Sequence, residues 1–145
     1  MRYRDACATI LVVGLTAESR TAVGERLVRR GYTCLMADSL SEAQARNEEA
    51  LVDLILLDSG MPNGQIRDFL EALRIRGDTP IMVLSAASCP DSEVRFLDSG
   101  ADDFLTFRAD CSILMARVRA LIRRTRLFQR DATSKSFLGL SLIHI

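Results

Sequence analysis

The sequence is poor in lysine, histidine and closely spaced cysteine, and each shortage excludes a kind of chemistry. Its only lysine is Lys135, so no mechanism that requires a lysine ammonium can operate within residues 1–134. Its only histidine is His144. The four cysteines are far apart and form no C-x-x-C pair: Cys7, Cys34, Cys89 and Cys111. A structural zinc site needs four ligands at motif spacing, so the pattern predicts reduced cytoplasmic thiols and no bound metal.

Long apolar runs are also absent. The longest ones, such as Ile10–Val13 and Leu54–Leu57, are far shorter than the roughly 18 residues that suggest a membrane span. The segment Met1–Asp5 leads into a short apolar stretch with no small-residue cleavage site behind it, so we expect no signal peptide. These features predict a cytoplasmic protein without a membrane partner, and the length of 145 residues fits one domain.

Acidic and basic residues are equal in number but unevenly distributed. Nineteen of each give a net charge of zero, so the chain as a whole is not attracted to nucleic acid. Residues 1–116 contain 12 arginines and 18 acids, a net charge of −6, whereas residues 117–145 contain seven basic residues and one acid, a net charge of +6. This asymmetry predicts a domain that is followed by a basic linker or interaction segment. The apolar segment Ser136–Ile143 is either the first strand of a truncated effector domain or an unrelated end of the chain.

Apolar runs and amphipathic stretches alternate along the chain. The runs predict strands over Thr9–Val13, Tyr32–Ala37, Val52–Leu57, Pro80–Leu84 and Asp102–Thr106. The amphipathic stretches predict helices over Ala17–Arg30, Ser39–Glu48, Gln65–Ile75, Pro90–Asp98 and Asp110–Thr125. Such alternation is typical of a parallel sheet built from βαβ units. At this length it predicts an α/β, flavodoxin-like, doubly wound five-stranded sheet of order 2-1-3-4-5 with five helices.

Polar residues follow the predicted strands at the edge where such folds bind ligands, which is the carboxyl edge of the sheet. Asp58 comes directly after the third strand, Ser85 follows the fourth, and Gly100–Phe107 includes the fifth. A carboxylate such as Asp58 at this edge serves as a nucleophile or a metal ligand in some proteins. In others it only begins a turn. The residue types alone leave both roles open.

Five segments in a fixed order make the sequence resemble the receiver domain of two-component response regulators. They are Ile10–Val13, Leu56–Asp58 with Met61–Pro62, Val83–Ala86, Gly100–Leu105 and Ala116–Leu121. The last two are most similar to receivers that precede a winged-helix DNA-binding domain. The resemblance covers residues 8–125, which implies a receiver domain over that range and a basic linker or tail over residues 126–145. The resemblance implies that Asp58 is the phosphoacceptor position and that Ser85 and Phe104 are the two switch positions. Plain core packing is an equally good interpretation of Phe104.

The sequence departs from the family pattern at the positions that support phosphorylation. The family has two acids directly after the first strand, which hold Mg²⁺ with the phosphoacceptor and a backbone carbonyl two residues beyond it. Here Gly14 and Leu15 replace those acids, while Asp58 and Gly60 remain. Phe107 replaces the family lysine after the fifth strand. Because phosphoryl transfer depends on metal and cationic stabilisation, we predict a degenerate pocket without a metal, a cofactor or enzymatic activity.

Two nearby residues are candidate substitutes for the missing groups. Glu18 would replace an acid, although an acid at a helix N-terminus is also favourable by itself. Arg108 would replace the lysine, although it lies one residue off, on the opposite side of an extended backbone. Apolar Leu15 and Phe107 would instead form a plug beside Phe104 that holds the domain in one state.

The subfamily that the sequence resembles pairs two receivers through the fourth helix, the fifth strand and the fifth helix. The residues that would form this face are Arg95, Asp98, Asp102, Asp103, Ile113, Arg117, Arg119 and Arg124. A two-fold dimer places each acid opposite an arginine of the partner, although Ile113 replaces the acid that would face Arg95. We therefore expect a homodimer.

A run of arginines at helical spacing extends past the predicted domain. Its members are Arg119, Arg123, Arg126 and Arg130. Such a face binds nucleic acid in some proteins, but no aromatic residue is interleaved except Phe128. A solvated or dimer-facing surface is the interpretation that we prefer at this stage.

The sequence as a whole predicts an atypical receiver that acts as a regulatory dimerisation and protein-interaction module, independent of Mg²⁺-dependent aspartyl phosphorylation. Its expected place is N-terminal to a DNA-binding transcriptional effector. The expected partners are a second copy, DNA through the missing effector domain, and a sensor kinase or another protein regulator. Two alternatives remain open: a phosphorylatable receiver that uses Asp58 with improvised ligands, and a stand-alone signalling adaptor without a DNA-binding domain.

Overall fold

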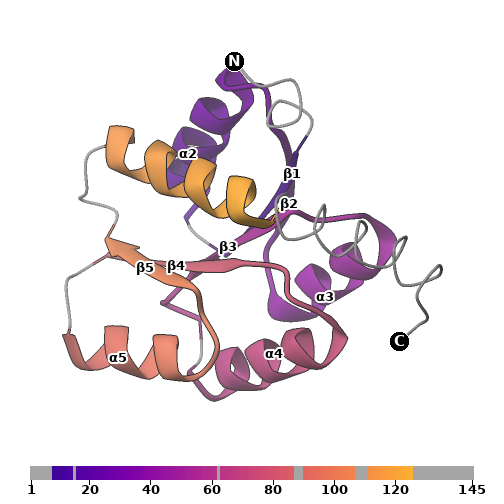
Figure 1. Ribbon diagram of the computed structural model, residues 1–145, viewed down its shortest axis with the longest axis vertical. Coiled ribbons are helices and arrows are strands. Elements are labelled where there is room, and N and C mark those ends of the chain that lie inside the picture. The colour runs from indigo at the N-terminus through magenta and orange to yellow at the C-terminus, as the bar shows by residue number, and fades with distance from the viewer. Residues whose placement is uncertain (1–7, 15, 62, 87–89, 107–110, 126–145) are drawn as a thin grey trace, which may run out of the picture.

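Five parallel strands form the centre of the molecule. The computed structural model describes residues 8–14, 16–61, 63–86, 90–106 and 111–125, and Figure 1 shows the sheet with helices on both of its faces. The strands are β1 (Thr9–Val13), β2 (Thr33–Ala37), β3 (Leu54–Asp58), β4 (Ile81–Ser85) and β5 (Asp103–Thr106). Their order in the sheet is β2-β1-β3-β4-β5, and every neighbouring pair is parallel. The predicted doubly wound fold is confirmed.

Helices connect the successive strands. They are α2 (Ala17–Arg29), α3 (Leu40–Glu49), α4 (Asn63–Arg76) and α5 (Pro90–Asp98), followed by a last described helix over residues 111–125. The starts of α4 and β3 differ by two residues from the predicted Gln65 and Val52, and the other described boundaries agree within one residue. Among the helices in the described ranges, none has both the length and the apolar character to cross a bilayer.

Polar side chains cap the first two labelled helices. The Ser19 N–H donates a hydrogen bond to Thr16 Oγ1 at 3.1 Å. In the same way the Glu42 N–H donates to Ser39 Oγ at 3.1 Å, and the Asp38 N–H donates to Glu42 Oε1 at 2.7 Å. These contacts satisfy backbone groups that lack a partner in or beside the first helical turn. The local sequence therefore fixes where α2 and α3 begin.

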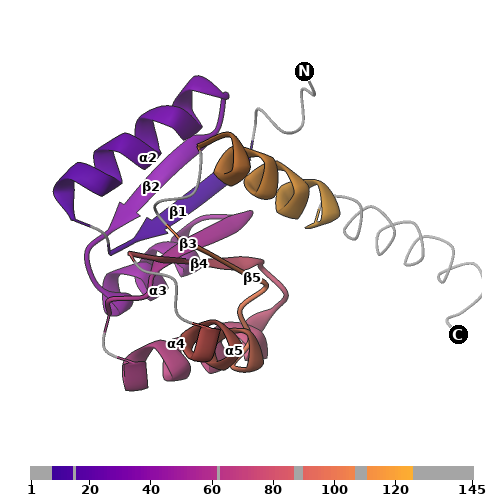
Figure 2. The ribbon, with the colours of Figure 1, turned by 90° about the vertical axis from the view of Figure 1, so that its left-hand side faces the viewer.

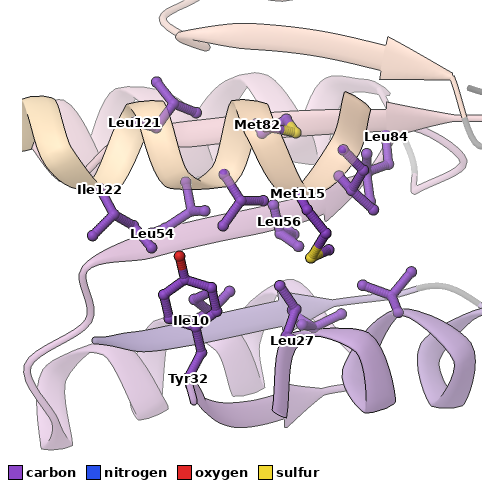
Figure 3. Close-up of a cluster of buried hydrophobic side chains, with 14 of the residues drawn as sticks. Ile10, Leu27, Tyr32, Leu54, Leu56, Met82, Leu84, Met115, Leu121 and Ile122 are labelled. Atoms are coloured by element: carbon purple, nitrogen blue, oxygen red, sulfur yellow. The ribbon is translucent and has the colours of Figure 1, made fainter. Parts of the chain in front are cut away.

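Alternate residues of the strands fill two separate hydrophobic cores. Along β1, Ile10 and Val12 point to one face of the sheet and Leu11 and Val13 to the other, and all four are fully buried. The first core lies between the sheet, α2 and the last described helix, and Figure 3 shows its side chains interlocking. The second core lies between the sheet and α3, α4 and α5. Burial on both faces explains why the strands are apolar throughout rather than alternating.

Helices of two groups cover the sheet, and Figure 2 shows their separation. We call α2 and the last described helix the first helical layer, because both contribute residues to the first core. We call α3, α4 and α5 the second helical layer, because they contribute to the second core. The two layers lie on opposite faces of the sheet, as the right-handed crossovers of a doubly wound fold require.

Two aspartates close the amino edge of the sheet. The Thr9 N–H, at the start of β1, donates to Asp53 Oδ2 at 2.8 Å. The Ile81 N–H, at the start of β4, donates to Asp102 Oδ2 at 2.8 Å. Asp53 directly precedes β3, which pairs with β1, and Asp102 directly precedes β5, which pairs with β4. The carboxylate before one strand therefore accepts a hydrogen bond from the first backbone amide of the neighbouring strand.

Candidate functional site at the carboxyl edge of the sheet

The carboxyl ends of neighbouring strands place two predicted residues at one edge. Asp58, the last residue of β3, is in register with Leu84 of β4, and Ser85 is in register with Thr106 of β5. The Ser59 N–H donates to the Leu84 carbonyl at 2.9 Å, which continues the pairing past the end of β3. Asp58 is half-buried and Ser85 is buried. The edge thus presents a carboxylate beside a hydroxyl.

The Asp58 carboxylate is part of a tight turn. Its Oδ1 accepts a hydrogen bond from the Gly60 N–H at 3.0 Å, and the Met61 N–H reaches the Asp58 carbonyl at 3.4 Å. A Cβ atom at residue 60 would lie 3.3 Å from Asp58 Oδ2, so glycine permits this close approach. An aspartate that bonds the backbone two residues on is typical of a turn. Asp58 therefore begins a turn, which was one of its two interpretations from sequence.

Gly14, at the end of β1, lies directly against Asp58. Its φ of +80° is a left-handed conformation that favours glycine, and its N–H donates to the Ala37 carbonyl at 2.9 Å. A Cβ atom at residue 14 would lie 2.9 Å from Asp58 Cβ and 3.1 Å from Met61 Sδ. Any side chain at this position therefore requires Asp58, Met61 or the backbone to move.

Met61 is a residue of this edge that the sequence analysis named only as part of a family segment. Its thioether lies against Gly14, and its side chain is partly buried against the second core. Methionine fills irregular gaps because its side chain is unbranched and polarisable. Spacing along the chain gives no signal for this contact, since it depends on the turn that Asp58 begins. Apolar surface therefore borders the carboxylate on the β1 side.

The remaining residues predicted for this edge have different outcomes. Leu15 and Phe107 lie outside the described residues. Phe104 is buried in the second core, and its ring stacks on that of Phe96 with centroids 6.0 Å apart and 19° between the planes. The structure therefore shows Phe104 packed in the core. Within the part of the chain that the structure describes, no group of three or more His, Cys, Asp or Glu side chains is arranged to hold a metal ion.

The predicted dimer face contains ion pairs within one chain. Arg117 Nη1 lies 2.9 Å from Asp103 Oδ1, and Arg124 Nη2 lies 3.5 Å from Asp102 Oδ1. That these acids face arginines of a second copy stays a prediction; within the single chain, arginines of that chain contact them. The reason is helical periodicity: positions 117 and 124 are about two turns apart, so both face β5.

Apolar side chains are exposed on and beside the predicted dimer face, whereas Arg119 points away from Arg117. Ile113 is 44% exposed, and on α5 Val94 is 58% and Leu97 is 38% exposed, so apolar surface is open to solvent. Arg119 is also exposed, but it lies two positions from Arg117 and therefore points to nearly the opposite side of the helix. Arg119 and Arg117 therefore point to different sides of the helix, and a place for Arg119 in a dimer face stays a prediction.

Arg74 of α4 connects this face to the amino edge of the sheet. Its Nε donates to the Gly100 carbonyl at 3.1 Å, and its Nη1 donates to the Thr79 carbonyl at 2.7 Å. Its Nη2 donates to Asp102 Oδ2 at 2.6 Å, the oxygen that also accepts from the Ile81 N–H. The sequence gives no signal for this role of Arg74, because its spacing is the same as that of any other arginine near the end of a helix.

The strand order, the carboxylate that ends β3 and the hydroxyl that ends β4 define a signalling domain of the receiver class. A family model described as the response regulator receiver domain matches residues 10–119. The chain therefore belongs to the response regulator receiver family, and the resemblance drawn from the sequence is confirmed. Domains of this family are signalling modules rather than typical enzymes.

Curated relatives are longer than this chain. It is 34% identical over 120 residues to the phosphate regulon transcriptional regulatory protein PhoB of Pseudomonas aeruginosa, which covers 81% of this chain and 52% of that protein. It is 36% identical over 137 residues to the response regulator MprA of Mycobacterium ulcerans, which covers 92% of this chain and 59% of that protein. The chain thus spans about half the length of the curated relatives that it matches.

Solved structures agree with the fold. A two-component response regulator from Clostridium difficile is 25% identical, with a TM-score of 0.74 over 81% of this chain and 97% of that one. The receiver domain of the TMAO respiratory system response regulator TorR is 26% identical, with a TM-score of 0.75 over 81% of this chain and 98% of that one. Each likeness extends over nearly the whole of the matched chain.

Proposed function

We propose that this chain is the receiver half of a DNA-binding transcription regulator and that it acts without Mg²⁺-dependent phosphorylation of Asp58. The observation that carries the proposal is the contact among Gly14, Asp58 and Met61. Where the family has the first of its two acids, this chain has a glycine at φ +80° with no room for a side chain. The relatives support the position in front of an effector, because they are about twice as long and are named as regulators of transcription.

Phosphoryl transfer to an aspartate needs positive charge around the transferred group. The oxygens that remain from the family's magnesium site are the Asp58 carboxylate and the Gly60 carbonyl. Mg²⁺ is bound through carboxylates and keeps several waters, and it is held weakly when substrate phosphates do not help. Positions 15 and 107 carry leucine and phenylalanine, which supply neither an anion nor a cation. On this proposal the family's Mg²⁺ does not fit the residues present.

The first alternative is phosphorylation of Asp58 with improvised ligands. Glu18 is exposed in the first turn of α2, where the partial positive charge of the helix N-terminus stabilises an acid. That position accounts for Glu18 without a role in the pocket. Arg108, the other candidate, lies outside the described residues. The second alternative, a stand-alone adaptor, is separated from our proposal by whether the natural reading frame continues into a DNA-binding domain.

A second part of the proposal is constitutive dimerisation through α5, β5 and the last described helix. Ile113, Val94 and Leu97 expose apolar surface on these elements. In a two-fold dimer each of them meets the same patch of the partner, and replacing an ion pair by apolar contact is neutral or favourable in many proteins. Arg95 and Asp98 form no ion pair within the described residues, so both are available to a second copy.

Intact-mass measurement tests whether Asp58 is phosphorylated. The 145-residue chain is incubated with Mg²⁺ and acetyl phosphate, and we expect its mass to stay unchanged. A stoichiometric phosphoryl adduct that is absent from an Asp58→Asn variant would overturn the proposal and favour improvised ligands.

A variant that restores the family residues serves as the positive control. It combines Gly14→Asp, Leu15→Asp and Phe107→Lys, because these changes return the two acids and the lysine of the family pattern. A side chain at residue 14 requires Asp58 or Met61 to shift, and Met61 is kept because Met61–Pro62 belongs to the segment that resembles the family. We expect the triple variant to bind Mg²⁺ by calorimetry and to gain the adduct, whereas Phe107→Lys alone gains neither. An adduct on the Phe107→Lys variant would contradict the role that we give to the missing acids.

A further inference from the structure

The first helical layer has a strongly basic outer surface. Residues 16–30 and 111–125 contain eight arginines and two acids, a net charge of +6, and the last described helix contains no acid at all. The second helical layer contains five arginines and eight acids, a net charge of −3. Spacing along the sequence groups only the arginines from residue 119 onward. The fold places α2 beside them, on the same face of the sheet.

Three arginines of the first layer form ion pairs: Arg20 with Asp38, Arg117 with Asp103, and Arg124 with Asp102. The other five are exposed and form no ion pair within the described residues: Arg26, Arg29, Arg30, Arg119 and Arg123. The first layer therefore presents a set of guanidinium groups that no carboxylate among the described residues pairs with.

Contacts of α2 show which way its arginines point. Gly24 faces β2, because a Cβ atom there would lie 2.7 Å from Met36 Cε, and Arg20 pairs with the residue that follows β2. Arg26 and Arg30 are one helical turn apart, and their positions lie on the other flank of α2. Since β2 is the edge strand, that flank is turned toward the middle of the sheet.

Contacts of the last described helix show the complementary orientation. Arg117 and Arg124 are turned toward β5 at the opposite edge of the sheet. Arg119 and Arg123 are one turn apart on the other flank, and that flank is turned toward α2. Both helices pack on the first core, where Leu27 of α2 and Met115 lie together (Figure 3). Both pairs of arginines thus lie on the flanks by which the two helices are turned toward each other.

We propose that this surface, formed by Arg26, Arg30, Arg119 and Arg123, binds the phosphate backbone of duplex DNA. The inference rests on the proposed function, because an effector that binds DNA would hold the receiver beside the duplex. Guanidinium groups match phosphate geometry with paired hydrogen bonds, and two helices side by side offer them over a broad area. A favourable interaction with the C-terminal end of a helix accounts for Arg26, but not for Arg119, which lies in the middle of its helix.

Fluorescence anisotropy of the 145-residue chain with a random-sequence duplex tests the proposal. Four phosphate contacts predict that affinity falls about a hundredfold between 50 and 200 mM salt. Changing Arg119→Gln with Arg123→Gln should lower the magnitude of the slope of log affinity against log salt by about two, and Arg26→Gln with Arg30→Gln should do the same. The matched control on the second layer, Arg67→Gln with Arg76→Gln, should leave the slope unchanged.

Three outcomes would overturn the proposal. One is an unchanged slope in both test variants while thermal melting shows them folded. Another is a lower salt slope in the Arg119→Gln, Arg123→Gln variant together with an unchanged slope in the Arg26→Gln, Arg30→Gln variant. That result would mean that the two helices do not share one DNA-binding surface. The third is equal binding to vesicles that contain phosphatidylglycerol, which would identify a membrane surface instead. The phosphodonor experiment involves no DNA, so the proposed function and the DNA-binding proposal can each be refuted without the other.

Discussion

The two helical layers cover equivalent faces of one sheet, yet they present opposite charges to solvent. Each layer packs on fully buried strand residues, but the first has a net charge of +6 and the second of −3. In the second layer ion pairs such as Arg76 with Glu48, 3.0 Å apart, neutralise part of the charge. Exposed ion pairs contribute about 0–1 kcal/mol to stability. Folding therefore does not dictate the sign of either surface, and the difference is open to a role in binding.

The largest expected effect concerns the two hydrophobic cores, where substitutions beneath either layer should destabilise the protein to a similar extent. Leu27 in the first core and Leu70 in the second are both fully buried. We expect Leu27→Ala and Leu70→Ala each to lower the free energy of unfolding by about 2–5 kcal/mol, because each removes buried methyl groups and leaves a cavity. Urea denaturation measures both. If only one variant loses stability, only one of the two layers is tightly packed on the sheet, and the two layers are not equivalent.

An intermediate effect on stability is expected at Arg74, an arginine of the second layer that donates hydrogen bonds to its own chain. Replacing it with alanine leaves the Thr79 and Gly100 carbonyls and the Asp102 carboxylate without this donor. We expect Arg74→Ala to lower the free energy of unfolding by about 1–3 kcal/mol. Arg67→Ala, an exposed arginine on the same helix, is the matched control and should have little effect. Equal losses would mean that the Arg74 contacts contribute nothing specific.

The smallest effect is expected where the last described helix meets β5. Arg117 and Asp103 are partly exposed, so Asp103→Asn should change the free energy of unfolding by no more than about 1 kcal/mol. It should also leave the dimer intact, because that pair lies within one chain. Ile113→Asp, by contrast, should dissociate the dimer in sedimentation velocity. A dimer that survives Ile113→Asp, or a wild-type monomer at high concentration, would rule out this face.

Most of the fold could be predicted because the sequence repeats one local pattern. Fully apolar runs such as Leu54–Leu57 alternate with amphipathic stretches, and this combination is typical of strands that helices cover on both faces. Capping residues such as Ser39 fixed the helix starts. The start of α4 was placed late, since Asn63 and Gly64 are poor helix formers and gave no periodic signal.

The site could be predicted only in part, since its geometry depends on contacts between distant segments. Asp58 and Ser85 were found because strand ends share an edge. The place of Met61 against Gly14 depends on a turn conformation, and the arginines of α2 join Arg119 only through the packing of the first core. Spacing along the sequence also gives no signal for the ion pair that Asp103 forms with Arg117 within one chain.

The left-handed backbone of Gly14 also limits how this sequence can change over generations. Any single substitution there adds a Cβ atom 2.9 Å from Asp58 Cβ and holds a residue in a conformation that costs roughly 1–3 kcal/mol. Natural domains have only about 5–15 kcal/mol of stability in total, so selection acts against such an intermediate. An acid at residue 14 therefore requires the contacts with Asp58 and Met61 to rearrange together with the new side chain. A return to the acid is for this reason a change of several contacts and not of one residue alone.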